Sequence, residues 1–251
     1  MHPTSLPLLH FDANPDAVIN PFRDEGYQFP QRMLFAFISA ANILKFVEQY
    51  PHTIVGTFET VSNEFHVYQL DVDGHQVGLC RAPLGASAAT QLLEFLIAYG
   101  AQRIVTVGSC GVLTDAPENQ FMVVTAALRD EGTSFHYLPP APSITLDADV
   151  ASHIQAVLTQ HAVPVHAVQT WTTDAFFRET RSKVAAHRAA GYTVVEMECA
   201  ALAACARFRG AQFGQILFAG DSLAAMDEYV ARDFGKASHL QALRLGCWCL
   251  M

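Results

Sequence analysis

A strand-to-helix junction at residues 192–210 is the feature that most restricts how this chain can fold. The β-branched run at 192–195 predicts a buried strand, and the alanine-rich run beyond it predicts a helix ended by Gly210. Two carboxylates, Glu196 and Glu198, flank a methionine between the strand and the helix. Ligands usually bind at strand ends in an α/β sheet, so these carboxylates are candidates for a binding site.

Apolar runs and amphipathic runs alternate along most of the chain. The apolar runs predict buried strands at residues 104–107, 122–125, 165–170 and 215–219. The amphipathic runs predict helices at residues 90–99, 149–161, 181–190 and 235–250. This alternation favours an α/β fold, and we expect a three-layer αβα sandwich with a mixed, mostly parallel central sheet. Because the composition shows no break, we expect residues 1–251 to form a single domain.

The first third of the chain predicts a mixture of elements. Residues 8–11 are interpreted as a short buried strand, and residues 32–50 as an apolar helix that ends before a proline. Apolar and polar residues alternate on both sides of Asp73 and Gly74. Since this dipeptide favours a tight turn, residues 65–81 are expected to form a β-hairpin.

Composition limits the partners of this chain. With 51% hydrophobic and 16% charged residues, the chain can bury a large core and also associate with copies of itself. A net charge of −9 and the lack of a basic run disfavour binding to nucleic acid or to a membrane surface. Neither a charged leader nor a run of about 18 apolar residues is present, which predicts a cytoplasmic protein. At this size no disulfide staples are needed, so we expect reduced thiols at Cys80, Cys110, Cys199, Cys205, Cys247 and Cys249.

Five predicted strand ends carry small or polar residues and are expected to converge on one edge of the sheet. They are residues 82–87, 108–111, 171–178, 196–198 and 221. Carboxylates at that edge accept hydrogen bonds from hydroxyls, and a desolvated aspartate holds a proton more readily. Glu198, Phe176 and Asp221 together suit a nucleoside, because they offer an acceptor for sugar hydroxyls, a face for a flat ring and a proton donor.

Each of these residues also has a purely structural interpretation when it is taken alone. Glu196 could be an ordinary ion-pair partner, Phe176 and Phe177 could belong to the core, and Asp221 could cap the next segment. The glycines of residues 108–111 are what any turn requires. It is the combination that favours a binding site.

Segments 108–111, 173–176 and 196–202, in this order, resemble the nucleoside phosphorylase and nucleosidase superfamily. That superfamily includes hexameric purine nucleoside phosphorylases, uridine phosphorylases and methylthioadenosine nucleosidases. The Glu-Met-Glu motif within residues 196–202 is its most specific part. The loop at 129–134 resembles that of uridine phosphorylases, whereas Asp221 resembles the acid of the purine-directed members.

The resemblance implies roles on the sugar and on the base. Glu198 would bind the 2′- and 3′-hydroxyls of ribose, with Met197 packed on the sugar and Glu196 nearby. Phe176 would stack on the base, with Phe177 beside it. Such stacking contributes roughly 1–3 kcal/mol in nucleic-acid systems.

The resemblance also implies the chemistry of cleavage. Asp221 would protonate or hydrogen-bond the leaving base, and Gly85, Ser87 and Ser109 would belong to a pocket for phosphate or water. The implied substrate is a small-molecule nucleoside, with phosphate as co-substrate and with no other cofactor and no metal. A homo-oligomer is implied as well, as a dimer, a trimer of dimers or a hexamer.

Two arginines that bind phosphate in phosphorylases of this superfamily are missing from their usual places. Residues 11–17 match the first phosphate loop but contain no arginine, and Thr106 occupies the place of the second. Thr180 and Ser182 stand where uridine phosphorylases carry the glutamine and the arginine that read uracil. The arginines that could substitute at the phosphate are Arg23, Arg32, Arg81 and Arg178.

Three functions are therefore weighed. Phosphorolysis of a nucleoside is the first prediction, and phosphate-independent hydrolysis is the alternative that the missing arginines favour. A binding protein without turnover is the third, and a protonatable Asp221 argues against it. A neighbouring subunit is expected to complete the pocket, with His2, His10 or Arg32 as candidates. The base, the acceptor and the subunit number stay open.

Overall fold

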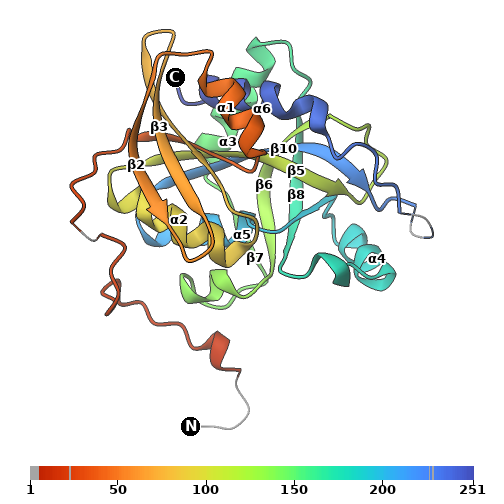
Figure 1. Ribbon diagram of the computed structural model, residues 1–251. Coiled ribbons are helices and arrows are strands. Elements are labelled where there is room, and N and C mark those ends of the chain that lie inside the picture. Colours follow the sequence, from red (N-terminus) through yellow and green to blue (C-terminus); the bar gives the residue numbers. More distant parts are fainter. Residues whose placement is uncertain (1–5, 23, 226, 228) are drawn as a thin grey trace.

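The strands of this protein form one continuous sheet (Figure 1). The computed structural model describes residues 6–22, 24–225, 227 and 229–251. In chain order the strands are β1 (Arg32–Ala36), β2 (His52–Glu59), β3 (Glu64–Val72), β4 (His75–Arg81), β5 (Arg103–Val112), β6 (Phe121–Asp130), β7 (Ser143–Thr145), β8 (His166–Thr173), β9 (Val194–Glu196) and β10 (Gln212–Ser222). Across the sheet their order is β10-β6-β8-β9-β5-β1-β4-β3-β2, and β7 pairs with β6.

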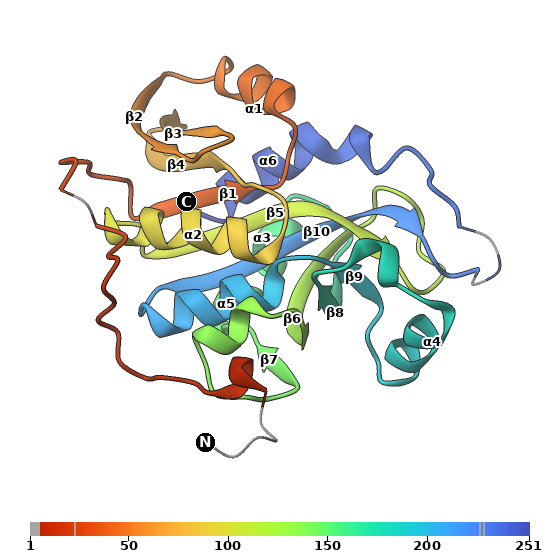
Figure 2. The ribbon, with the colours of Figure 1, turned by 60° about the horizontal axis from the view of Figure 1, so that its bottom comes forward.

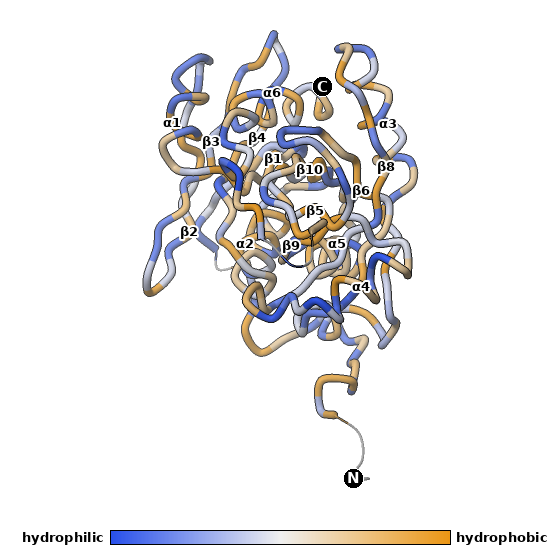
Figure 3. The backbone as a smooth tube through the Cα atoms, turned by 90° about the vertical axis from the view of Figure 1, so that its right-hand side faces the viewer, coloured by the Kyte–Doolittle hydropathy of each residue, from blue (hydrophilic) through white to orange (hydrophobic). Residues whose placement is uncertain are grey.

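The sheet closes on itself at one end. Strands β4, β1, β5 and β10 run parallel to one another, whereas β6 is antiparallel to β10 and β9 is antiparallel to β5. Because β8 pairs with both β6 and β9, the strands β5, β10, β6, β8 and β9 form a hydrogen-bonded ring. Figure 3 shows β5, β6, β9 and β10 gathered at the centre of the molecule. The pair between Gly111 and Val195 brings the end of β9 beside the end of β5.

Helices cover both faces of the sheet. They are α1 (Ala40–Val47), α2 (Ala86–Ala98), α3 (Ala148–Gln160), α4 (Arg181–Ala189), α5 (Cys199–Phe208) and α6 (His239–Trp248), with short 3₁₀ turns η1 (Pro7–Leu9), η2 (Thr133–His136), η3 (Phe176–Arg178) and η4 (Lys236–Ser238). Helices α2 and α5 contribute to one apolar cluster, and α1, α3 and α6 to another (Figure 2). Ile104 and Val105, neighbours on β5, belong to different clusters because successive strand residues point to opposite faces. The predicted α/β fold with a mixed sheet is confirmed.

Two predictions for the first third of the chain are wrong. Residues 8–11 do not form a buried strand, because Pro7–Leu9 is a 3₁₀ turn at the surface. Residues 32–50 are not one helix but strand β1 followed by α1, which Ser39 caps at its beginning. The apolar run at Met33–Ala36 lies between β4 and β5, and a strand buried on both faces has the same continuous pattern as a buried helix.

Other local predictions are confirmed, and one element is longer than predicted. The hairpin forms as β3 and β4, with Asp73 and Gly74 both at positive φ in the turn. Residues 108–111 are part of β5 and do not form a glycine loop beyond its end. Their backbone continues to pair with β10 and then with β9, so the ladder extends through the glycines.

Two further features concern the cysteines and the helices. All six cysteines are free and buried. Within the described residues, no helix is long and apolar enough to cross a membrane.

Candidate functional site

A cavity of about 190 Å³ lies where β5, β9 and β10 meet, and most of the predicted site residues line it. Its described lining includes four carboxyl groups and no arginine or lysine. The lining residues are Phe37, Leu84, Gly108, Ser109, Cys110, Gly111, Phe176, Glu179, Val195, Glu196, Met197, Glu198, Gln215, Leu217, Asp221 and Phe234. The sheet ring therefore assembles one acidic, partly apolar cavity.

Glu198 is the N-cap residue of α5 and stands directly before the helix, two residues after the end of β9. Its side chain is buried, and its Oε1 accepts a hydrogen bond of 2.6 Å from the backbone N–H of Gly85. Burial and the neighbouring charge of Glu196 raise the pKa of Glu198 above its ordinary value. Backbone hydrogen bonds from Gly85 and Met197 oppose this rise.

Glu196 is buried at the end of β9 and is held by four hydrogen bonds. Its Oε1 accepts from the hydroxyls of Thr170 at 3.2 Å and Thr172 at 2.6 Å. Its Oε2 accepts from the backbone N–H groups of Glu198 at 2.8 Å and Cys199 at 2.7 Å. Burial raises the pKa of Glu196, and the four donors oppose that rise. With both oxygens engaged, Glu196 fixes the beginning of α5 and the backbone that carries Glu198.

Asp221, on β10, lines the same cavity and is 7% exposed. Its Oδ2 is buried and has no hydrogen-bond partner within the described chain. Burial raises the pKa of Asp221, although a hydrogen bond from Tyr229 and the charge of Arg232 oppose the rise. An unpaired buried carboxyl oxygen is costly unless it is protonated or meets a ligand.

Phe176 and Phe177 lie in η3 and differ in where they point. Phe176 lines the cavity and is 42% exposed, whereas Phe177 is 93% exposed and lines a second, neighbouring cavity. Their rings meet edge to face at 5.0 Å. Of the two, Phe176 is the one that shares a cavity with Glu198 and Asp221.

Glu179 is a site residue that the sequence reasoning missed. It follows η3 and lines the cavity together with Asp221. Burial and the negative charge of Asp221 raise the pKa of Glu179 to about 7. The sequence feature that could have indicated Glu179 is its spacing of three residues from Phe176, because side chains three residues apart share one face of a 3₁₀ turn.

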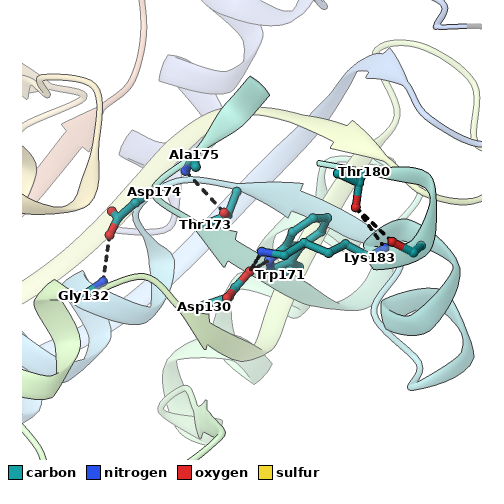
Figure 4. A network of polar contacts seen from close by, with 9 residues as sticks. Asp130, Gly132, Trp171, Thr173, Asp174, Ala175, Thr180 and Lys183 are labelled. Atoms are coloured by element: carbon teal, nitrogen blue, oxygen red, sulfur yellow. Dashed lines mark hydrogen bonds and ion pairs between the residues drawn. The ribbon is translucent and has the colours of Figure 1, made fainter. Parts of the chain in front are cut away.

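A polar network fixes the segment before η3 (Figure 4). Asp130 accepts hydrogen bonds from the indole N–H of Trp171 at 2.9 Å and from the ammonium of Lys183 at 2.8 Å. Asp174 accepts from the backbone N–H of Gly132 at 2.8 Å. These contacts tie β6, β8 and α4 together, and so they determine where η3 emerges from the sheet.

The predicted phosphate or water pocket is only partly assembled. Ser109 and Gly108 line the cavity, but Ser87 is exposed and is not part of it, and the N–H of Gly85 is engaged by Glu198. Phe37 follows β1, and its N–H donates to Val107. A Cβ on residue 108 would lie 3.0 Å from the Cβ of Phe37, so a larger residue at position 108 would require Phe37 to shift.

The prediction that residues 11–17 match the phosphate loop after the first strand is wrong. Because the first strand of the sheet is β1, the loop after it begins at Phe37, and residues 11–17 lie outside the sheet. The loop after β1 contains no arginine either. Thr106 is fully buried and donates to the carbonyl of Gly214, so it does not face the cavity.

The candidate replacement arginines that the structure describes do not line the cavity. Arg32 is at the beginning of β1 and donates to the carbonyls of Leu250 and Met251. Arg81 lies over the ring of Phe65, and Arg178 is exposed at the end of η3. Arg23 and His2 lie outside the described residues.

Two further residues predicted from the resemblance have structural contacts. Arg129 is buried and donates to Ser134 and to the carbonyls of Leu138 and Pro139. These hydrogen bonds hold together the loop that follows β6. Thr180 caps the beginning of α4. Within the described residues, no group of histidines, cysteines or carboxylates is arranged to hold a metal ion.

Comparisons with known proteins show what the chain is similar to. The family model described as the phosphorylase superfamily matches residues 40–245. A guanosine phosphorylase of Halorubrum lacusprofundi is 26% identical over 165 residues, which cover 65% of this chain and 68% of that protein. A uridine phosphorylase of Thermococcus kodakarensis is 26% identical over 193 residues, with 71% and 68% covered.

Solved structures share the fold. A uridine phosphorylase of Vibrio fischeri superposes with a TM-score of 0.77 at 22% identity, covering 89% of this chain and 92% of that one. An AMP nucleosidase of Bacteroides thetaiotaomicron superposes with a TM-score of 0.70 at 22% identity, covering 88% of each chain. Since the family model covers most of the sequence and includes the junction at the cavity, the chain belongs to the phosphorylase superfamily.

Proposed function

We propose that this protein cleaves the N-glycosidic bond of a nucleoside in the cavity bounded by β5, β9 and β10. The observation that carries the proposal is the presence of Glu198 and Asp221 in one cavity, both of them buried, with Oδ2 of Asp221 lacking a hydrogen-bond partner within the described chain. Relatives named as guanosine, purine nucleoside and uridine phosphorylases support the same reaction class.

The cavity residues divide the chemistry between sugar and base. Glu198 accepts hydrogen bonds from the 2′- and 3′-hydroxyls, Met197 packs on the sugar, and Phe176 stacks on the base. As the bond between C1′ and the base nitrogen breaks, its electron pair goes to the base, and protonated Asp221 supplies the proton. The positive charge that develops on the sugar is stabilised by the nearby carboxylates.

Phosphate is the first candidate for the acceptor that attacks C1′, because the matching relatives are named as phosphorylases. A phosphate dianion needs positive charge, and the described lining supplies none. In this version of the reaction a second copy of the chain in a homo-oligomer brings the cation.

Water is the second candidate acceptor, and one observation favours it. Phe37 packs against Gly108 at the end of the cavity where the glycines of β5 lie. An aromatic ring beside an acidic lining disfavours a dianion and leaves a neutral nucleophile unaffected.

The reaction is tested by incubating the purified protein with purine and pyrimidine nucleosides, with and without phosphate, and measuring free base by chromatography. We expect base to be released. Release that depends on phosphate assigns phosphorolysis, and release without phosphate assigns hydrolysis. Nucleoside binding without release under either condition would overturn the proposal.

A further inference from the structure

Two cavities share walls at the base end of the site. The second cavity, of about 300 Å³, is lined by Phe176, Phe177, Glu179, Arg181, Val184, Leu223, Ala225 and Tyr229. Phe176 and Glu179 line the first cavity as well, and Tyr229 hydrogen-bonds Asp221. The second cavity therefore continues the region in which the leaving base is placed.

The size of the first cavity is the first argument that both belong to one site. Pockets for small ligands usually measure roughly 300–1,000 Å³. At about 190 Å³ the first cavity falls below this range, although it holds the residues for sugar, bond and proton transfer. A ligand that reaches Glu198 and Asp221 needs the neighbouring space for the rest of its volume.

The chemistry of the walls changes at Glu179. Four carboxyl groups line the first cavity, whereas the second is formed largely by apolar side chains, with Val184 buried and Ala225 exposed. Arg181 and Tyr229 are its other polar members, and Arg181 contacts Asp227 at 3.6 Å. Transfer of an apolar group from water into the second cavity favours binding. Transfer of a charged group opposes binding, because the charge loses its solvation.

The carboxyl groups of Asp221 and Glu179, at the base end, favour a base that presents a hydrogen-bond acceptor beside a donor. With the proton on Asp221, as the proposed function requires, Asp221 donates one hydrogen bond. Glu179 is then relieved of the negative charge of Asp221, so it ionises and accepts one. Adenine presents an acceptor at N7 beside a donor at its 6-amino group, whereas guanine presents two acceptors there. A purine with an N–H on its exocyclic 6-nitrogen therefore matches this pair.

We propose that the base site extends past Glu179 into the second cavity, and that it takes purine nucleosides whose exocyclic 6-amino nitrogen carries an apolar substituent. This inference rests on the proposed function for the placement of the sugar and the base. Glu179 accepts the remaining N–H, and the substituent packs among Phe177, Val184 and Leu223.

The test compares adenosine with N6-benzyladenosine. Dissociation constants are measured by equilibrium dialysis at pH 8, and base release is measured in parallel by chromatography. We expect N6-benzyladenosine to bind at least about tenfold more tightly than adenosine, since one methylene in an apolar pocket already changes selectivity roughly 10- to 200-fold. Equal or weaker binding of the benzyl compound would overturn the inference, and so would binding of neither nucleoside.

Two matched variants locate the effect. Ala225→Phe fills the second cavity from an exposed position, and it should remove the preference while leaving adenosine within about twofold of its original affinity. Ala185→Phe changes an exposed alanine of α4 that does not line the cavity, and it should keep the preference. A preference that survives Ala225→Phe contradicts the inference. Binding with the expected preference but without base release keeps the inference and rejects the proposed function.

Discussion

The end of the cavity that is proposed to hold the sugar (the sugar end) and the end that is proposed to hold the base (the base end) are built differently. At the sugar end, Glu196 is held by four hydrogen bonds and Glu198 by the N–H of Gly85, all supplied by the chain itself. At the base end, Asp221 has a buried oxygen without a partner, and Phe176 is nearly half exposed. The difference indicates that the sugar end is preorganised, whereas the base end is completed by its ligand.

The largest expected effect is on proton transfer at the base end. Asp221→Asn should slow release of adenine or another purine by roughly 10²- to 10⁴-fold, because the amide cannot supply the proton. The same variant should cleave p-nitrophenyl riboside at nearly the original rate, since that leaving group needs no proton. Initial rates with both substrates provide the measurement, and equal slowing of the two would place Asp221 outside proton transfer.

The next effect is on stability, and it separates the two carboxylates of the sugar end. Glu196→Ala leaves two hydroxyls and two backbone N–H groups without their acceptor, and it should lower the free energy of unfolding by about 2–4 kcal/mol. Glu198→Ala removes one intrachain hydrogen bond and should cost about 1 kcal/mol or less while abolishing ribonucleoside turnover. Urea denaturation of both variants gives the comparison. A destabilisation by Glu198→Ala as large as that by Glu196→Ala would show that both are structural.

The smallest effect is the share that Glu179, at the base end, contributes to the pH dependence of stability. Glu179 has its pKa raised from 4.5 to about 7, so the folded protein holds a proton there that the unfolded chain releases. Stability of the unliganded protein therefore falls as the pH rises through this window. Melting temperatures measured between pH 5 and pH 8 should show the decline. Glu179→Gln should reduce the total fall in melting temperature over this range by a few degrees. An unchanged slope in the variant would contradict the raised pKa.

Local signals in the sequence predicted much of the fold. Asp73 and Gly74 predicted the hairpin because turn chemistry and alternation agree there. The apolar run at Met33–Ala36 was predicted to be helical but forms a strand. Burial on both faces removes the periodicity that distinguishes a strand from a helix. The ring of strands depends on pairings between distant segments, such as Gly111 with Val195, which local patterns do not encode.

The same limit applies to the site. The motif around Glu198 and the residues Phe176 and Asp221 were found by type and order along the chain, and all three line one cavity. Their individual roles stay predictions. Phe37 and Glu179 were missed, since their importance arises from neighbours that are distant in sequence, Gly108 and Asp221.

The closed ring has a mechanical consequence. A strand at the margin of a sheet, such as β2, can fray without disturbing its neighbours, but a ring has no margin from which to open. Separating any two of β5, β10, β6, β8 and β9 disturbs the pairing around the whole circuit. The carboxyl groups of β9 and β10 thus share one cooperative unit, and their spacing persists until that unit unfolds as a whole.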